Sequence, residues 1–224
     1  SAKSASLKIS REPSAKETSA KKYRVAQYFD IRAITDFTIS PDGKTIAYVT
    51  NTNGLPNIWT IPIDGGWANQ ITLEENAVFS IGYNPKRNEI VFSSDNKGDE
   101  NHQLFNVSDK GGETTNLTPG HVGSQIIFCA FSKNGKKILF SSNKRDKRYF
   151  DTYITDIDSG AEECVFTSDD PFPYTAVAWS KNEKYILYQK FYSNSNHDLF
   201  LYDVAAKKFL NITEHKGSMK NTNG

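Results

Sequence analysis

Cysteine, methionine and long apolar runs are scarce in this sequence. Its 224 residues include two cysteines, Cys129 and Cys164, and one methionine. Two cysteines in a chain of this length build neither a disulfide framework nor a cysteine-based metal site, so both are expected to stay thiols. No segment approaches the ~18 consecutive apolar residues of a membrane-spanning helix. The sequence therefore predicts a fold without cross-links and without a membrane span.

A strong net charge is also missing. The formal net charge is +1, so no global field favours nucleic acid or an anionic membrane as a partner. Positive charge is concentrated in residues 1–22, which contain no aromatic residue. Such a segment cannot bury enough apolar surface to offset its ordering entropy, and we expect a mobile basic tail. It lacks the apolar stretch of a secretory signal, so the expected compartment is the cytoplasm.

Four internal repeats organise residues 23–224. Each repeat opens with a turn and an apolar strand, and the four openings read SPDGKTIAYVT, NPKRNEIVFSS, SKNGKKILFSS and SKNEKYILYQK. A second strand element follows each opening, and a short closing element (NQIT, TNLT, CVFT and LNIT) ends each unit. Units of ~40–50 residues that keep this order are the signature of a β-propeller.

Each repeat is expected to fold as one blade of four antiparallel strands. Gly and Asn stand where tight hairpins need them, most clearly at Asn134-Gly135. The strands IAYV, IVFS, ILFS and ILYQ are apolar at consecutive positions, which suits sheets covered on both faces. The predicted fold is therefore an all-β propeller, with a sandwich of fortuitous similarity as the alternative. The approximate blade boundaries are 35–77, 78–122, 123–171 and 172–224.

The segment before the first blade has a mixed pattern. Apolar residues between Tyr23 and Ile34 recur near helical spacing. A short helix or an extended strap over the propeller is expected there.

The opening stretch FDIRAITDFTISPDGKTIAYVTN (29–51), with IWTIPIDGG (58–66) and QIT (70–72) after it, resembles a known family. It is similar to the start of serine peptidases of the prolyl oligopeptidase family, particularly the acylaminoacyl-peptidase and dipeptidyl-peptidase-like branch. The resemblance covers about residues 23–224. It implies TolB-like blades, about half of a seven- or eight-bladed ring, and an α/β-hydrolase domain in the parent chain. It also implies that the propeller restricts which peptides reach an active site between the two domains.

The catalytic motif of that family does not occur in this sequence. Catalysis there uses a Ser on a G-x-S-x-G elbow, followed along the chain by Asp and His. The nearest pattern here, GHVGSQ (120–125), places Ser124 after only one glycine of the pair. No catalytic, cofactor-binding or metal-binding residue is assigned, and the chain alone is predicted not to be an enzyme. The predicted function is the non-catalytic propeller region of a serine peptidase, and the alternative is an autonomous TolB-like binding propeller.

The histidines and acidic clusters offer weak candidates for a site. The histidines are His102, His121, His197 and His215. His102 and His197 occupy equivalent repeat positions, which favours a loop or capping role over catalysis. The pairs Glu74-Glu75 and Glu162-Glu163 could hold a peptide amino terminus, as propeller glutamates do in dipeptidyl-peptidase relatives. No flanking residues match a substrate motif, so solvated loop charge is the favoured interpretation.

Two charged stretches have the composition of ligand sites. The loop DNKGDEN (95–101) is acidic but misses the spacing of a calcium loop. The stretch NKRDKRYFD (143–151) combines cations with aromatic residues, as nucleic-acid sites do. Its position between two strands favours a solvated loop.

Four blades of a larger ring leave one bare sheet face on the first blade and one on the fourth. The predicted bare faces include Ile46 and Tyr48 on the first and Ile186 and Tyr188 on the fourth. Monomers rarely tolerate contiguous apolar patches beyond a few hundred Å². Self-association is therefore expected, for example as a pseudo-eight-bladed ring of two chains.

Overall fold

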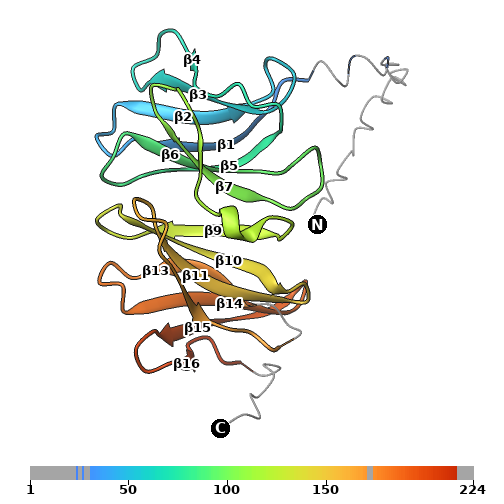
Figure 1. Cartoon of the computed structure of the whole chain (residues 1–224), viewed down its shortest axis with the longest axis vertical. Coiled ribbons are helices and arrows are strands. Elements are labelled where there is room, and N and C mark those ends of the chain that lie inside the picture. The colour runs from blue at the N-terminus through green and yellow to red at the C-terminus, as the bar shows by residue number, and fades with distance from the viewer. Residues whose placement is uncertain (1–23, 25–26, 28–30, 171–173, 216–224) are drawn as a thin grey trace, which may run out of the picture. The chain divides into compact units, whose positions relative to one another are not determined.

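The compact part of the chain consists of four β-sheets. The computed structural model describes residues 24, 27, 31–170 and 174–215. The described residues from 32 onward belong to the larger of two units of the chain. Within the larger unit, four sheets of four antiparallel strands follow one another along the chain (Figure 1). The predicted all-β fold of four-stranded blades is confirmed. The predicted basic tail lies outside the described residues, as does most of the segment that precedes the first blade.

Strands pair in sequence order within every sheet. The first blade contains β1 (Ile34–Ile39), β2 (Thr45–Thr50), β3 (Asn57–Pro62) and β4 (Asn69–Gln70). The second contains β5 (Val78–Tyr83), β6 (Glu89–Ser94), β7 (Gln103–Ser108) and β8 (Thr115–Asn116), followed by the 3-10 turn η1 (Pro119–His121). The third contains β9 (Ile126–Phe131), β10 (Lys137–Asp146), β11 (Tyr149–Asp156) and β12 (Glu162–Phe166). The fourth contains β13 (Tyr174–Trp179), β14 (Tyr185–Ser193), β15 (Asn196–Asp203) and β16 (Lys208–Asn211).

The turn between the first two strands of a blade is held by its first side chain. Ser40 Oγ donates to Asp42 Oδ1 at 2.7 Å and accepts from the Thr45 backbone N–H at 2.9 Å. Ser132 and Ser180 make the same two bonds in the third and fourth blades. A short hydroxyl that serves both the turn and the strand after it explains why Ser recurs at this position.

Asn84 takes the place of that serine in the second blade and also reaches the third. Its Oδ1 accepts from the backbone N–H groups of Lys86 and Arg87, and its Nδ2 donates to the Gly135 carbonyl at 2.8 Å. Gly135 has a φ of +68°, and a Cβ there would lie 2.2 Å from Asn84 Oδ1. Glycine is therefore required at this turn for its backbone conformation and for the close approach of the neighbouring blade.

The closing threonine of a repeat joins the third strand to the end of the blade. Thr72 Oγ1 donates to Asn57 Oδ1 at 2.7 Å and accepts from the Ile58 backbone N–H at 2.9 Å. Thr118 and Thr213 accept the equivalent backbone N–H in the second and fourth blades. In the first two blades these bonds satisfy buried polar groups, and a bond of the same kind in three blades explains the recurring final Thr of their closing elements.

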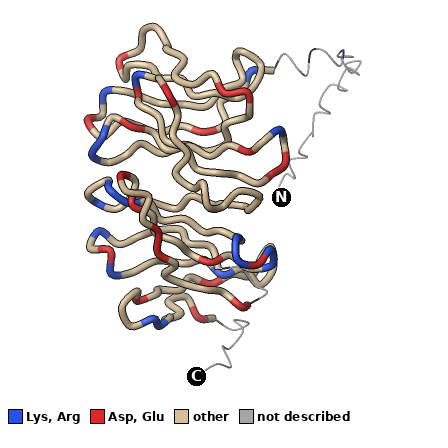
Figure 2. The backbone as a smooth tube through the Cα atoms, viewed as in Figure 1, with Lys and Arg blue, Asp and Glu red and all other residues tan. Residues whose placement is uncertain are grey.

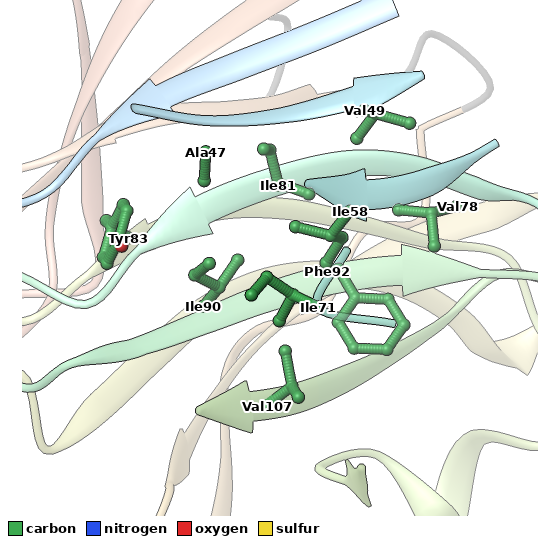
Figure 3. Packing of buried hydrophobic residues seen from close by; sticks show 10 residues of the cluster. All are labelled: Ala47, Val49, Ile58, Ile71, Val78, Ile81, Tyr83, Ile90, Phe92 and Val107. Carbon is green, nitrogen blue, oxygen red and sulfur yellow. The ribbon is translucent and has the colours of Figure 1, made fainter. Parts of the chain in front are cut away.

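The apolar core lies between the blades. The seam of the first two blades buries ten residues (Figure 3): Ala47, Val49, Ile58, Ile71, Val78, Ile81, Tyr83, Ile90, Phe92 and Val107. The seam of the second and third blades buries Val91, Leu104, Leu117, Ile126, Ile138, Phe140 and Tyr153. The last seam buries Leu139, Val165, Tyr174, Ala176, Ile186, Tyr188, Phe200 and Tyr202. Consecutive residues thus serve opposite seams, as Ile90 and Val91 do, which is why these strands are apolar at successive positions.

The same alternation corrects the predicted bare face of the fourth blade. Ile186 and Tyr188 are fully buried in the seam with the third blade, so they are not bare. Residues at these repeat positions face the preceding blade, and for the fourth blade that is the third blade. At the equivalent positions of the first blade, Ile46 and Tyr48 are only half-buried. The bare face of the fourth blade carries the intervening residues, such as Leu187.

Each bare face presents apolar side chains in a row across its strands. On the first blade, Phe37, Tyr48 and Trp59 are register neighbours, and Phe37 is 70% exposed. The matching row on the fourth blade is formed by Leu187, Leu201 and Leu210. Both rows lie on faces that would be seams in a longer run of blades.

The two cysteines lie on opposite edge strands of the third sheet. Cys129 is on β9 and Cys164 is on β12, and both are free thiols, as predicted. Burial raises the pKa of the Cys129 thiol to about 12, and burial is also the main cause that raises the pKa of the Cys164 thiol. A raised pKa is the opposite of what a reactive thiolate needs.

Candidate functional site

The four histidines lie in separate places. His102 stacks on Phe79, with ring centroids 4.4 Å apart. His197 occupies the same position in the fourth repeat, at the start of β15. The Nδ1 of His215 lies 2.9 Å from Asp198 Oδ1. His121, in η1, is buried between the second and third blades.

His121 links a serine to a carboxylate. Its Nδ1 lies 2.8 Å from Ser142 Oγ, and its Nε2 lies 2.7 Å from Glu162 Oε2. A serine, a histidine and an acid in this order have the composition of a hydrolytic triad. Ser142 is fully buried, however, and the His121 side chain is 0% exposed. A hydroxyl sealed in this way cannot reach a substrate carbonyl, so the three residues tie η1 to β10 and β12.

This arrangement corrects one interpretation of the acidic pairs. Glu162 lies on strand β12 and not in a loop, and although it is exposed it pairs with His121 and Lys144. Its neighbour Glu163 is exposed on the same strand. Glu75, in the connection between β4 and β5, is exposed, as expected for a loop charge.

The buried histidine predicts a loss of stability at mildly acidic pH. Burial lowers the pKa of His121 below its ordinary 6.5, and its contacts with Glu162 oppose this only in part, while Lys144 adds to the lowering. A proton then binds the unfolded chain more tightly than the folded one. The contribution of His121 to stability is complete above about pH 6.5 and decreases as the pH falls toward the folded-state pKa. Urea unfolding at about pH 7.5 and about pH 5.5 should show the lower free energy of unfolding at the acidic value.

Two variants separate this effect from general acid sensitivity. His121→Gln removes the titrating ring, so the difference between the two pH values should shrink. His102→Gln removes a histidine that stacks on Phe79 at the surface, and the difference should stay. An unchanged pH dependence in His121→Gln would assign the effect to other groups.

The basic stretch 143–151 is the β10–β11 hairpin, not an irregular loop. Its cations have these partners: Lys144 with Glu162, Arg145 with Asp151, Arg148 with Asp146, and Lys147 with the Gly123 carbonyl. Figure 2 shows Lys and Arg interspersed with Asp and Glu along this hairpin. Paired cations of this kind do not form the basic patch that a nucleic acid would need.

A cavity of about 540 Å³ opens at the seam between the second and third blades. The second blade contributes Phe79, Asp95, Gly98, Glu100 and His102, and the third contributes Gln125, Ile126, Ile127 and Phe150. Most of these residues come from the starts of the first strands and from the connection between β6 and β7, and Phe150 comes from the start of β11. Phe79 and Ile127 are 42% and 40% exposed, so apolar surface is open to solvent here. The volume lies within the range of small-ligand sites.

Aromatic rings set the spacing of this seam. The rings of Phe128 and Phe131 pack edge to face, with centroids 5.2 Å apart. Gly82 on β5 lies opposite them, and a Cβ there would be 3.0 Å from the Phe128 ring. Strands β1 and β5 lie side by side, whereas β5 and β9 approach each other less closely. Room for a cavity arises where these inner strands are held apart.

The loop at residues 95–101 presents the side chains of Asp95 and Glu100 to the cavity. Asp95 is 6% exposed, and its Oδ2 accepts from the Glu100 backbone N–H at 3.3 Å. Asp99 accepts from the backbone N–H groups of Asn96 and Asn101, and these bonds lower the pKa of its carboxyl. Glu100 has a φ of +59°, in the left-handed region. Such a conformation in a residue other than glycine marks a loop that its own bonds hold in place.

The cavity is not apparent from the sequence. The loop 95–101 is acidic without the spacing of a calcium loop, and in the described part of the chain no group of His, Cys, Asp and Glu could hold a metal ion. The cavity forms only when Phe150, one full repeat away along the chain, lines the same seam as His102. Hairpin length gave no signal, because β14 and β15 of the fourth blade are about as long as β10 and β11.

Comparison with known proteins identifies similar sequences and folds. The family model described as TolB beta propeller domain matches residues 19–223. Dipeptidyl aminopeptidase BIII from Pseudoxanthomonas mexicana is 29% identical over 133 residues, which is 58% of this chain and 19% of that protein. TolB from Acinetobacter baumannii superposes with a TM-score of 0.61 at 19% identity, over 80% of this chain and 43% of that one. A puromycin hydrolase superposes with a TM-score of 0.59 at 14% identity, over 82% and 29%. This chain thus spans about a fifth of the curated relative.

Proposed function

This chain belongs to the TolB beta propeller domain family, and we propose that it is the non-catalytic propeller region of a serine peptidase related to prolyl oligopeptidase. In this proposal the blades are part of a seven- or eight-bladed ring. A hydrolase domain of the same polypeptide supplies the catalytic residues. The propeller limits access to that domain to short or unfolded peptides.

The observation that carries the proposal is the match to a dipeptidyl aminopeptidase at 29% identity. The solved structures are less than 25% identical and support the fold alone. The open cavity between the second and third blades adds a surface where a peptide side chain could bind. The buried Ser142 and His121 support a role without chemistry, because the one triad-like group in the described residues is closed to substrate.

The first expected result is that this chain does not react with a fluorophosphonate probe. Such probes label a serine that a neighbouring histidine activates beside an oxyanion hole. Ser142 is sealed, and Ser124 is buried with no G-x-S-x-G elbow around it. Intact-mass measurement after incubation should show the unmodified chain, with a known serine peptidase as the positive control. Stoichiometric labelling of any serine would contradict the non-catalytic role.

A binding experiment tests the peptide-facing role. Fluorescent peptides of random sequence should bind the chain, and the same sequences held inside a folded carrier protein should bind more weakly, because the proposed surface lies in a recess. The competing function, an autonomous TolB-like binding module, is favoured by the similarity to solved TolB structures. Preference for the folded carrier, or no binding of free peptides, would favour the competing function.

A further inference from the structure

The cavity between the second and third blades combines two features. Its walls are aromatic and aliphatic, and its charged lining consists of carboxylates. Among the lining residues, Asp95 and Glu100 are acidic and none is Lys or Arg. A ligand for such a cavity needs an apolar body and a positive end.

Asp95 is the buried one of the two carboxylates that line the cavity. It is 6% exposed, and the one hydrogen bond that the described residues give its carboxylate reaches Oδ2. No cation of the described chain lies within ion-pair distance of Asp95 or Glu100. The nearby cations of the β10–β11 hairpin are engaged by other partners, for example Arg145 by Asp151 and Arg148 by Asp146. A buried carboxylate without a counterion favours a cationic ligand, because burial costs free energy that a paired charge offsets.

The aromatic walls favour one kind of cation. Phe79 and His102 stack with ring planes 24° apart, and Phe150 lines the cavity from β11. A guanidinium group stacks on aromatic faces and donates two parallel hydrogen bonds to a carboxylate. An ammonium group is a strongly hydrated point charge and gains less from stacking. The alkyl stem of an arginine would cover the open apolar surface of Ile127.

We propose that this cavity binds the side chain of an arginine in a peptide, with the guanidinium held by Asp95 and Glu100 against the aromatic rings. The inference rests on the proposed role of the domain in contacting peptides and deepens it. The propeller then selects basic peptides and does not merely exclude large ones.

The test uses small probes and heteronuclear NMR on this chain. N-acetyl-arginine amide has the side chain and no charged terminus, and N-acetyl-citrulline amide is its neutral isostere. The arginine probe should shift the amide resonances of residues 79, 95–102, 125–127 and 150, and the citrulline probe should bind at least about tenfold more weakly. Added salt should weaken the arginine probe alone, because only its binding depends on charge.

Three variants locate the binding. Asp95→Asn and Glu100→Gln should each weaken the arginine probe, and Asp95→Asn by about tenfold, because the buried carboxylate is the better partner. Glu163→Gln removes an exposed carboxylate on β12 and should leave binding unchanged. Thermal unfolding checks that Asp95→Asn is folded. If that variant unfolds, Glu100→Gln still decides the matter, since the Glu100 side chain makes no described hydrogen bond.

Several results would overturn the inference. Equal binding of arginine and citrulline probes would show that the charge is not recognised, and shifts confined to other blades would place the site elsewhere. Leucine amide, which has a free α-amine and a neutral side chain, would overturn it by binding as tightly as the arginine probe. Peptides that bind without any arginine preference would leave the proposed function intact and remove this inference. An arginine probe that binds while peptides do not would support the arginine site and contradict the proposed peptide-contacting function.

Discussion

At micromolar concentration the isolated chain is expected to sediment as an assembly of two or more copies. The bare face of the first blade exposes a row that includes Phe37 and Trp59, and the bare face of the fourth exposes Leu210. At each of the three seams inside the chain, the earlier blade contributes the face that is bare on the fourth blade. The later blade contributes the face that is bare on the first. A second copy offers the same complementary pair, so head-to-tail contact would continue the existing interface.

Charge substitutions at the two faces test this contact. Phe37→Lys and Leu210→Lys each place a cation on one bare face, and each should shift the mass measured by light scattering toward the monomer. An equimolar mixture of the two variants should recover association, because one intact face of each kind remains. That recovery distinguishes a head-to-tail contact from a contact between two identical faces.

Two outcomes would contradict the expectation. A stable monomer of the unmodified chain at these concentrations would show that four blades are sufficient by themselves. Association that survives both substitutions would place the contact on another surface.

The repeat spacing was enough to predict the blades, because each repeat carries its own turn and closing chemistry. Ser40 and Thr72 are fixed by bonds within one blade, and their recurrence is visible in the sequence. The direction in which each strand faces was not predictable from strands such as ILYQ. Both faces of a blade are apolar, so no hydrophobic alternation separates the side of the preceding blade from the side of the next.

The candidate site depended on contacts between blades, which repeat spacing does not encode. Asp95 and His102 belong to one repeat, and Phe150 belongs to the next. In the sequence Gly82 is an ordinary strand glycine, and only the structure shows that the Phe128 ring lies opposite it. Most of the residues that line this site differ from the residues at the equivalent positions of the other repeats. An alignment of the repeats therefore does not single them out.

The corrected facing of the strands leads to the second large effect, a comparison of Tyr188 with Tyr48. The two residues occupy the same position in the fourth and first repeats. Tyr188 is fully buried, packs against Phe166 and donates its hydroxyl hydrogen to Thr152 Oγ1 at 2.8 Å. Tyr48 lies half-buried on the bare face beside Phe37. Tyr188→Ala should lower the free energy of unfolding by about 3–5 kcal/mol, because it leaves a cavity in a closed seam.

Tyr48→Ala should cost about 1 kcal/mol or less when measured on the dissociated chain, because no blade of the described chain covers its side chain. Its main effect should be weaker association. Urea unfolding at low protein concentration measures the first quantity, and light scattering at high concentration measures the second. Tyr188→Phe keeps the ring and removes one hydrogen bond, so a loss of about 1 kcal/mol is expected. If Tyr48→Ala destabilised the dissociated chain as much as Tyr188→Ala, the two faces would be equally covered, and the first blade would have a partner within the same chain.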